Sequence, residues 1–466
     1  METKRFYLMG KILNLWSGHD INLPGQVNRI VLETKAPSTY EVKPTDFNGL
    51  RPIPKLEVQV GSEVKAGQCL FFDKDLADVK FVSPVSGEVV DIVRGPKRKI
   101  EAIRILADSE QIFIDHGTAD VNSLNIEEIK GKMLSGGVWP LITKRPFGVV
   151  ADPNETPKAI FVSGYDTAPL SADTNFLLEG NEEAFQIGIN ALNKLTPGNV
   201  NLTFLQKYEP SEKIKAIENV DDHFVTGKCK HPAGNVGIHI HHIDPINKGD
   251  VVWTLKAQDV IVIGRLFLEG KYNTERLVAV QGPEVANPAY YKVYQGACIE
   301  SLISASGLKK EHVRFISGDI LTGTRIDRNG HLGFSDYTIA VIEEGDTYEF
   351  MGWQFPTTPR PSISRTFLST WFNIFGISFD YEATTNMRGE KRAYVVSGQY
   401  EKVLPMDIYP VHLIKSIMYG DFEEMEGLGI YEVLEEDLAL CEFVCTSKMN
   451  VQELLRQGLD TLRIEG

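Results

Sequence analysis

Hydrophobic and polar residues alternate with different periods along the chain, and residues 159–205 show the clearest change of period. Residues 159–162 are a short apolar run bounded by turn-forming residues, which is typical of a buried strand. The next stretch has helical spacing, with an apolar face made by Phe185, Ile189, Leu192 and Leu195. Residues 200–205 are apolar again. Strand, helix and strand joined by short loops predict a parallel, Rossmann-like sheet.

The flanking residues extend this α/β region in both directions. Residues 126–134 have the pattern of a short helix, and residues 109–125 that of a linker. Two further apolar runs, at residues 251–255 and 260–263, predict more strands before a break near Gly270.

Residues 56–93 have a strand pattern of a different kind. Val58, Val60 and Val64 alternate with polar neighbours, as half-buried strands do, and glycines stand where tight turns need them. The stretch resembles a biotinyl/lipoyl barrel-sandwich domain. That family carries an attachment lysine at the tip of the hairpin, but residues 76–78 hold none, and Lys74 and Lys80 are out of register. We therefore expect a structural β module without a carried group, followed by a solvated hairpin tip at residues 94–99.

The second half of the chain changes from strands to helices. Residues 275–325 combine strand patterns at 276–282 and 313–316 with a short helix at 299–305. Beyond about residue 350 helical periodicity dominates, at 411–419 and 451–462. We predict four parts: a barrel-sandwich hybrid at 18–108, a Rossmann-like domain at 109–270, a β-grasp domain at 271–348 and a mainly helical domain at 349–466.

Composition narrows the classes of function. The net charge of −15 excludes the basic footprint that nucleic-acid binding needs. The longest apolar stretches, 260–268 and 371–379, fall short of the roughly 20 residues that span a bilayer. The apolar patch near the N-terminus is too short for a secretion signal. Five cysteines in no paired pattern suit a reducing compartment. We therefore expect any membrane link to go through another protein.

Two loops beside the predicted parallel strands are candidates for a nucleotide site. Residues 136–146 contain Gly136 and Gly137 but continue with the bulky Trp139 and Pro140, and residues 163–173 form the second loop. Glycine loops bind phosphates because they let backbone N–H groups approach closely. No G-x-G-x-x-G or P-loop is present. The simpler interpretation is an ordinary strand–helix junction.

Two clusters of possible metal ligands are each incomplete. His231, His239, His241 and His242 lie within HPAGNVGIHIHHIDP, and on a strand His239 and His241 would share a face. Only Asp244 could complete a set, so a turn-rich loop leading into a strand is the better interpretation. An iron–sulfur cluster needs four thiolates. Cys441 and Cys445 supply two, and on a helix they would be buried as small apolar residues. We predict no metal site.

The order of the parts resembles a known group of flavoproteins. Residues 275–325 are similar to the soluble-ligand-binding β-grasp (SLBB) domain of flavin-bearing NADH dehydrogenase subunits, and the preceding α/β segment is similar to their flavin domain. Their acidic Asn-x-x-Glu-x-Glu-Pro motif corresponds to residues 163–169, where the glutamates are replaced by Asp166 and Ala168. The resemblance therefore implies a degenerate flavin loop, formed by Gly136, Gly137, Trp139, Asp166 and Ala168.

Three strings make the resemblance more specific: RPFGVVAD near 145–152, HPAGNVGIHIHHIDP and VVWTLKAQDVIVIGRLF. The chain from about residue 18 resembles the A subunits of the sodium-translocating NADH:quinone oxidoreductase. Residues 1–14 fall outside the resemblance, and we expect an upstream extension there. The resemblance implies a cofactor-free subunit on the cytoplasmic face of the bacterial inner membrane. There it would belong to a six-subunit complex whose flavins and iron–sulfur centres lie on other subunits.

The resemblance also implies a partner in a membrane-embedded subunit, with NADH oxidation, ubiquinone reduction and sodium pumping carried out by the whole complex. We expect no catalytic residue on this chain. The family is associated with quinone binding, for which Trp139, Arg145 and Asp173 are the candidates. Arg145 and Asp173 are near enough in sequence to pair across a residual cleft. The alternative is a self-sufficient flavin or iron–sulfur oxidoreductase that admits electrons.

Overall fold

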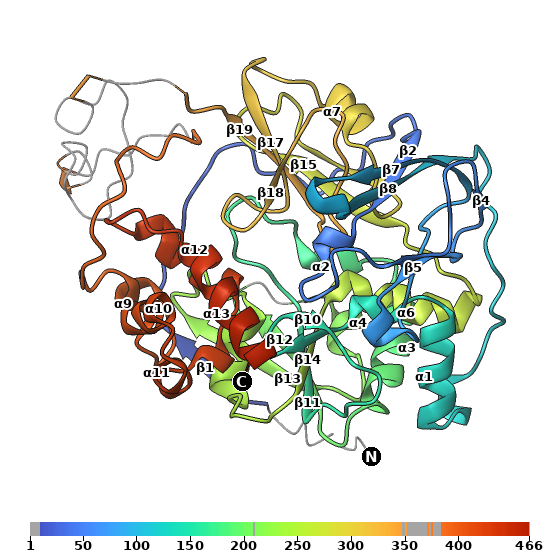
Figure 1. Cartoon of the computed structure of the whole chain (residues 1–466), viewed down its shortest axis with the longest axis horizontal. Coiled ribbons are helices and arrows are strands. Elements are labelled where there is room, and N and C mark those ends of the chain that lie inside the picture. The colour runs from blue at the N-terminus through green and yellow to red at the C-terminus, as the bar shows by residue number, and fades with distance from the viewer. Residues whose placement is uncertain are drawn as a thin grey trace.

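A computed structural model describes residues 10–207, 210–346, 350–351, 371, 374–375 and 384–465. Most of the apolar stretch 371–379 therefore lies outside the described residues. Figure 1 shows the C-terminal helices on one side of the α/β domain, and the β-grasp and barrel strands together on another. None of the described helices is long and apolar enough to cross a membrane.

The α/β domain is built on a sheet that has seven strands within the described residues, in the order β1-β13-β12-β11-β14-β9-β10. Neighbours from β1 to β14 run parallel, and β9 and β10 form an antiparallel edge. The strands are β1 (Ile12–Leu15), β9 (Thr143–Arg145), β10 (Val149–Val150), β11 (Ala159–Ser163), β12 (Val200–Leu205), β13 (Asp221–Gly227) and β14 (Val252–Lys256). The predicted Rossmann-like sheet is confirmed.

The edge strand β1 pairs with β13 from Ile12 to Leu15. Residues 12–14, which belong to the segment expected to be an upstream extension, are therefore part of the sheet.

Six α-helices are described in this domain, of which the sequence predicted the first and the third. They are α1 (Ile126–Ser135), α2 (Thr174–Leu178), α3 (Glu182–Asn193), α4 (Glu212–Lys215), α5 (Val236–Ile243) and α6 (Ala257–Glu269). The predicted apolar face of α3 is fully buried or nearly so. The strand predicted at 260–263 is wrong, because those residues lie in α6, and the strand predicted through His239 and His241 is wrong, because both lie in α5.

Close packing explains why α6 is so apolar. A Cβ at Gly264 would lie 1.7 Å from the carbonyl oxygen of Ala184 on α3, and one at Gly188 would lie 2.2 Å from the carbonyl oxygen of Val260. The two helices therefore touch backbone to backbone. Because α6 is buried on most of its surface, it shows a continuous apolar run that a short strand would also show.

The barrel part contains two small sheets within the residues described, with orders β2-β8-β7-β4 and β3-β5-β6. Its strands are β2 (Thr39–Val42), β3 (Lys55–Leu56), β4 (Glu63–Val64), β5 (Cys69–Phe72), β6 (Lys80–Val82), β7 (Gly87–Arg94) and β8 (Ile100–Ala107). Of the alternating valines only Val64 lies in a strand, so the strand predicted through Val58 and Val60 is wrong.

Two lysines lie at or near the hairpin tip between β5 and β6: Lys74 is exposed in a 3-10 turn, and Lys80 begins β6. Lys80 places its ammonium over the Phe72 ring, 4.1 Å from the ring centroid. The short 3-10 turn Pro96–Arg98 joins β7 to β8 with exposed side chains, which confirms the predicted solvated tip.

The β-grasp part and the C-terminal part complete the fold. The first has five strands among the described residues, ordered β16-β15-β19-β17-β18. Its elements are β15 (Arg276–Gln281), β16 (Ala289–Val293), α7 (Glu300–Ser306), β17 (Val313–Ser317), β18 (Thr324–Ile326) and β19 (Thr338–Glu343). The second is mainly helical from residue 400 on, with α9 (Tyr400–Val403), α10 (Pro410–Tyr419), α11 (Phe422–Gly427), α12 (Glu435–Val444) and α13 (Val451–Glu465).

Candidate functional site

The predicted flavin loop lies directly after α1 and is packed on both sides. Gly137 has a φ of +73°, a conformation that side chains rarely adopt. A Cβ at Gly137 would lie 2.5 Å from Val82 of the barrel part, and one at Gly136 would lie 2.4 Å from Leu266 of α6. The two glycines therefore bring the loop against other protein side chains, at positions where a nucleotide site would bring it against phosphate.

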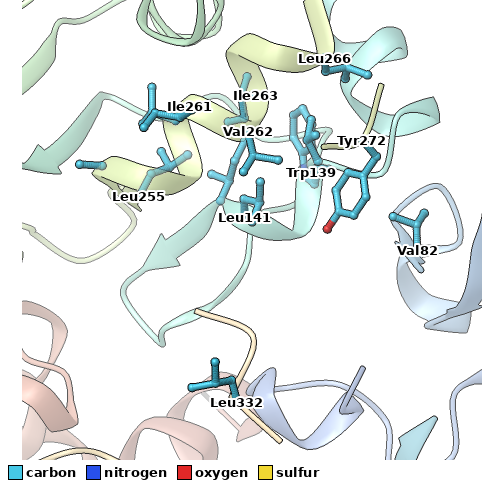
Figure 2. Close-up of a cluster of buried hydrophobic side chains, with 14 of the residues drawn as sticks. Val82, Trp139, Leu141, Leu255, Ile261, Val262, Ile263, Leu266, Tyr272 and Leu332 are labelled. Carbon is cyan, nitrogen blue, oxygen red and sulfur yellow. The ribbon is translucent and has the colours of Figure 1, made fainter. Parts of the chain in front are cut away.

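Trp139 fills the space behind these glycines. Its indole is fully buried and stands edge-on to Trp253 of β14, with ring centroids 5.5 Å apart. The indole N–H donates to the carbonyl oxygen of Ala151 at 2.8 Å. Figure 2 shows the indole among side chains of α6, Tyr272 and Val82. The bulky residue thus completes a core that three parts of the chain share.

The carboxyl ends of β11 and β14 mark the point where the strand order reverses. In open α/β sheets ligands bind in the crevice at such a point. Here the loop after β11 is tied to the loop before α5: Ser163 donates its hydroxyl to the carbonyl oxygen of Gly234 at 3.0 Å, and Tyr165 donates to that of Ala233 at 2.5 Å. Gly234 N–H donates to the Thr167 hydroxyl at 2.9 Å. Protein groups therefore occupy the hydrogen bonds that a ligand would use.

A local hydrogen bond joins the two positions that replace the family's glutamates. Asp166 is exposed, and its carboxylate accepts the N–H of Ala168 at 2.7 Å, a local turn. At the end of β14, Lys256 donates to the carbonyl oxygen of Ser335 in the β-grasp part at 2.8 Å. The β-grasp part therefore lies against the end of the sheet where the crevice would open.

Arg145 and Asp173 each bind other partners. Arg145, on β9, is 1% exposed, and its guanidinium donates to Asp437 at 2.9 Å and to Glu436 at 2.5 Å, both on α12. Asp173 caps α2 and accepts from Arg29 near the surface, at 2.8 Å. The two candidates thus belong to two separate contacts, and no cleft pairing joins them.

The buried contact of Arg145 was not visible in the sequence. Asp437 is 0% exposed and lies in the first turn of α12, where it also accepts the N–H of Leu434 at 3.0 Å. A Cβ at Gly237, in the first turn of α5, would lie 2.1 Å from the Asp437 carboxylate. Two helix N-termini and one guanidinium thus surround this buried carboxylate. The Arg145–Asp437 contact joins residues that are 292 positions apart in the sequence, and neither an arginine nor an aspartate alone predicts such a pair.

Each histidine of the predicted cluster has its own protein partner. His239 donates from Nε2 to the carbonyl oxygen of Ala233 at 2.8 Å, and burial lowers its pKa to about 4. His241 bonds Glu432 at 2.6 Å, His242 bonds the carbonyl oxygen of Pro405, and His231 lies 3.3 Å from the Thr167 hydroxyl. Across the described ranges, no group of three or more His, Cys, Asp or Glu residues could hold a metal ion.

Cys441 and Cys445 lie on α12 and at its C-terminal cap, and both are buried. Burial raises the pKa of the Cys441 thiol well above its usual range. Both are free thiols, as are Cys69, Cys229 and Cys298. Their environment is the helical core, as the i, i+4 spacing predicts.

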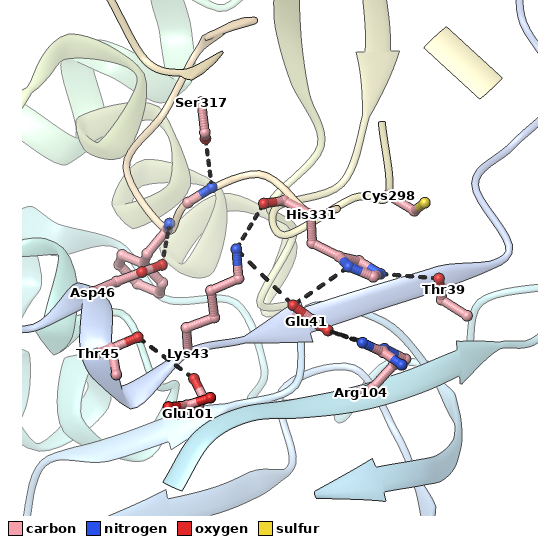
Figure 3. Close-up of polar contacts among 12 residues, drawn as sticks. Thr39, Glu41, Lys43, Thr45, Asp46, Glu101, Arg104, Cys298, Ser317 and His331 are labelled. Atoms are coloured by element: carbon pink, nitrogen blue, oxygen red, sulfur yellow. Dashed lines mark hydrogen bonds and ion pairs between the residues drawn. The ribbon is translucent and has the colours of Figure 1, made fainter. Parts of the chain in front are cut away.

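A second buried polar network connects the barrel part to the β-grasp part (Figure 3). Glu41 on β2 accepts from Arg104 on β8 at 2.7 Å and lies 3.3 Å from Nδ1 of His331. The other ring nitrogen of His331 is 2.9 Å from the Thr39 hydroxyl, and Lys43 donates to the His331 carbonyl oxygen at 2.7 Å. Since Nδ1 faces a carboxylate, it carries the proton, and the hydroxyl donates to Nε2. Burial, and not the facing carboxylate, keeps the ring neutral by lowering the pKa of His331.

The network predicts a loss of stability in acid. Burial lowers the pKa of His331 to about 4 from 6.5, despite the nearby Glu41 carboxylate. Between pH 6.5 and 4 the unfolded chain therefore binds a proton at this histidine and the folded chain does not. The contribution of neutral His331 to the free energy of unfolding is complete above pH 6.5 and is lost as the pH falls towards 4. We expect His331→Gln to flatten the pH dependence of the unfolding free energy between pH 7.5 and 5, measured by urea denaturation.

The exposed His312 provides the matched control for this experiment. His312→Gln should leave the slope in this pH range unchanged. An unchanged slope in His331→Gln would contradict the assigned role of His331.

These parts define the class: a multidomain α/β protein that joins a barrel-sandwich hybrid, a Rossmann-like domain, an SLBB-type domain and a helical C-terminal region. Three family models match in that order along the chain. They are the NqrA N-terminal barrel-sandwich hybrid domain at residues 13–108, the NqrA second alpha/beta domain at 124–272 and the NQRA C-terminal domain at 277–328.

Curated relatives match over almost the whole length. The A subunit of the Na(+)-translocating NADH-quinone reductase of Vibrio atlanticus is 36% identical over 458 residues, covering 98% of this chain and all of the relative. Its counterpart in Yersinia pseudotuberculosis is 35% identical with the same coverage. The chain belongs to the family of A subunits of the Na(+)-translocating NADH-quinone reductase.

Among solved structures, an air-oxidized NAD+-reducing [NiFe]-hydrogenase matches with a TM-score of 0.38 and 11% identity, over 74% of this chain and 64% of that one. A likeness at this level carries no argument about function.

Proposed function

We propose that the chain is a cofactor-free docking subunit of a bacterial sodium-translocating NADH:quinone reductase. The complex oxidises NADH and reduces ubiquinone, while this chain sits on the cytoplasmic face and binds a membrane-embedded subunit. In this proposal the flavins and iron–sulfur centres belong to other subunits, and the isolated chain has no catalytic activity.

The buried position of Trp139 carries the proposal. A flavin phosphate at this loop would need the space that Leu266 and Val82 occupy at the two glycines, and its ring would meet a fully buried indole. Protein interiors are close-packed, so a filled site cannot admit a cofactor without local unfolding. The two thiols Cys441 and Cys445 are likewise too few for a cluster and are enclosed by the helical core.

The cofactor content of the purified chain tests this proposal. After anaerobic reconstitution with FMN, iron and sulfide, we expect neither flavin absorbance nor iron at a stoichiometric level. The reason is the packing of the loop and the burial of the two thiols. Stoichiometric incorporation of either group would favour the alternative, a self-sufficient electron-entry protein. A flavin-binding protein treated in parallel controls for the reconstitution.

A contribution to the quinone site of the complex is the second part of the proposal. The three sequence candidates do not favour direct quinone binding, because Trp139 and Arg145 are enclosed by protein and Asp173 is engaged by Arg29. We therefore propose that the contribution comes from the surface where the chain meets its membrane partner. It acts by holding that partner's quinone pocket in shape, without ring stacking in the degenerate loop.

A further inference from the structure

The C-terminal helices enclose a groove that the proposed function does not yet use. It has a volume of about 370 Å³ and lies between α10, α11 and α13. Apolar side chains form most of its lining: Ile417, Met418, Phe422, Met425 and Leu454. A Cβ at Gly458 would lie 2.8 Å from Ile417, so this glycine lets α13 close against α10 and form the end wall.

The rim of the groove exposes large apolar side chains to solvent. Met418 is 48% exposed and Tyr419 is 87% exposed, at the last turn of α10 before Gly420 ends the helix. Methionine-rich surfaces adapt to varied apolar partners because the side chain is unbranched and polarizable. The groove and this rim together form one apolar surface.

The charge around the groove is strongly negative. Residues 401–466 contain 14 acidic and 5 basic residues, a net −9 of the chain's total of −15. Asp421, Glu423 and Glu424 stand exposed at the start of α11, beside the groove. Asp421 caps α11, and none of the three forms an ion pair with another of the described residues. By contrast, Arg456 on α13 is paired with Glu435.

We propose that this groove docks a basic amphipathic segment of the membrane-embedded partner subunit. Its apolar face would enter between α10, α11 and α13, and its Lys or Arg side chains would face Asp421, Glu423 and Glu424. Amphipathic helices bind apolar grooves in this way. Cytoplasmic segments of membrane proteins carry an excess of Lys and Arg, which gives the charge that this rim complements. The inference rests on the proposed function, since it needs a membrane partner.

Membrane binding of the full-length purified chain tests the groove. The probes are membranes that contain the other subunits but lack this chain, membranes that lack the whole complex, and vesicles of phosphatidylcholine with phosphatidylglycerol. Sedimentation gives the apparent Kd for each. We expect Met418→Glu to weaken binding to the first membranes at least about tenfold, or about 1.4 kcal/mol. We expect Glu423→Lys/Glu424→Lys to do the same, with wild-type binding that falls as salt rises.

Matched substitutions on the opposite side of the molecule provide the controls. Ile126 is an exposed apolar residue at the start of α1, which lies away from α10 and α13 in Figure 1, and Glu110 and Glu127 are exposed acids. Ile126→Glu and Glu110→Lys/Glu127→Lys should bind as the wild type does. Thermal unfolding checks that every variant is folded, and the charge variant, whose changes are all on the surface, keeps the test valid should Met418→Glu unfold.

The outcomes separate the two proposals. The proposed docking function would be overturned if the wild-type chain bound equally well to membranes with the other subunits and to membranes that lack the whole complex. Specific wild-type binding that both groove variants retain would overturn the groove alone. The wild type could also bind the lipid vesicles as tightly as the membranes that contain the other subunits, with this binding lost in the two groove variants. That result would show that the groove binds lipid and would reject a protein occupant.

Discussion

Arg145→Met is expected to lower the free energy of unfolding by about 3–5 kcal/mol, measured by urea denaturation at pH 7.5. The guanidinium is the positive partner of a carboxylate that no water reaches: Asp437 is 0% exposed, and Arg145 itself is 1% exposed. Removing one partner of a buried pair leaves the other charge without compensation. Because the pair joins β9 of the sheet to α12 of the helical part, the loss weakens the contact between these two parts.

The same substitution at an exposed pair provides the control. Arg51 bonds Asp75 with two nitrogens, at 2.6 and 2.7 Å, but the side chains are 55% and 63% exposed. Arg51→Met should cost about 0–1 kcal/mol, since surface pairs contribute little. Adding Asp437→Asn to Arg145→Met should recover part of the loss by removing the orphaned charge. A cost below about 1 kcal/mol for Arg145→Met alone would show that the pair does not hold the parts together.

The sequence predicted helices and strands correctly where the residues followed a single hydrophobic period, either that of a strand or that of a helix. The apolar face of α3 and the runs of β11 and β12 were unambiguous, because strand and helix periods followed each other with turn residues between them. The prediction from hydrophobic period failed at α6 and α5. A helix buried all round has no polar face to reveal its period, and the alternating letters of residues 237–243 imitate a strand. Tertiary packing, including the contact of Gly237 with Asp437, decided those cases.

The candidate site was predictable in kind but not in its contacts. Bulky Trp139 after Gly136 and Gly137 already indicated a loop unsuited to phosphate, and the structure places the indole in the core. The partners of Arg145 were not predictable, because a pairing across 292 residues leaves no local signal. The Glu41–His331 network was missed for the same reason, since it forms only when the barrel and β-grasp parts meet.

Trp139→Ala is expected to destabilise the chain by about 3–5 kcal/mol, the range for removing a large buried aromatic side chain. The change empties the space between Trp253 and the side chains of α6 and leaves the carbonyl oxygen of Ala151 without its donor. Trp139→Phe should cost less, because most of the volume remains. Trp16 is 61% exposed, and Trp16→Ala is the matched control, with an expected cost below about 1 kcal/mol.

Added ligands then distinguish a packed core from a dormant binding site. Indole should raise the melting temperature of Trp139→Ala, because a ligand that binds only the folded state stabilises it, and should leave Trp16→Ala unchanged. FMN should stabilise neither variant, since Val82 and Leu266 still occupy the positions that phosphate would need. In the assembled complex, Trp139→Ala should keep the wild-type KM for ubiquinone while its melting temperature falls. A raised KM with unchanged stability would instead place quinone in this loop and give Trp139 a direct role in binding it.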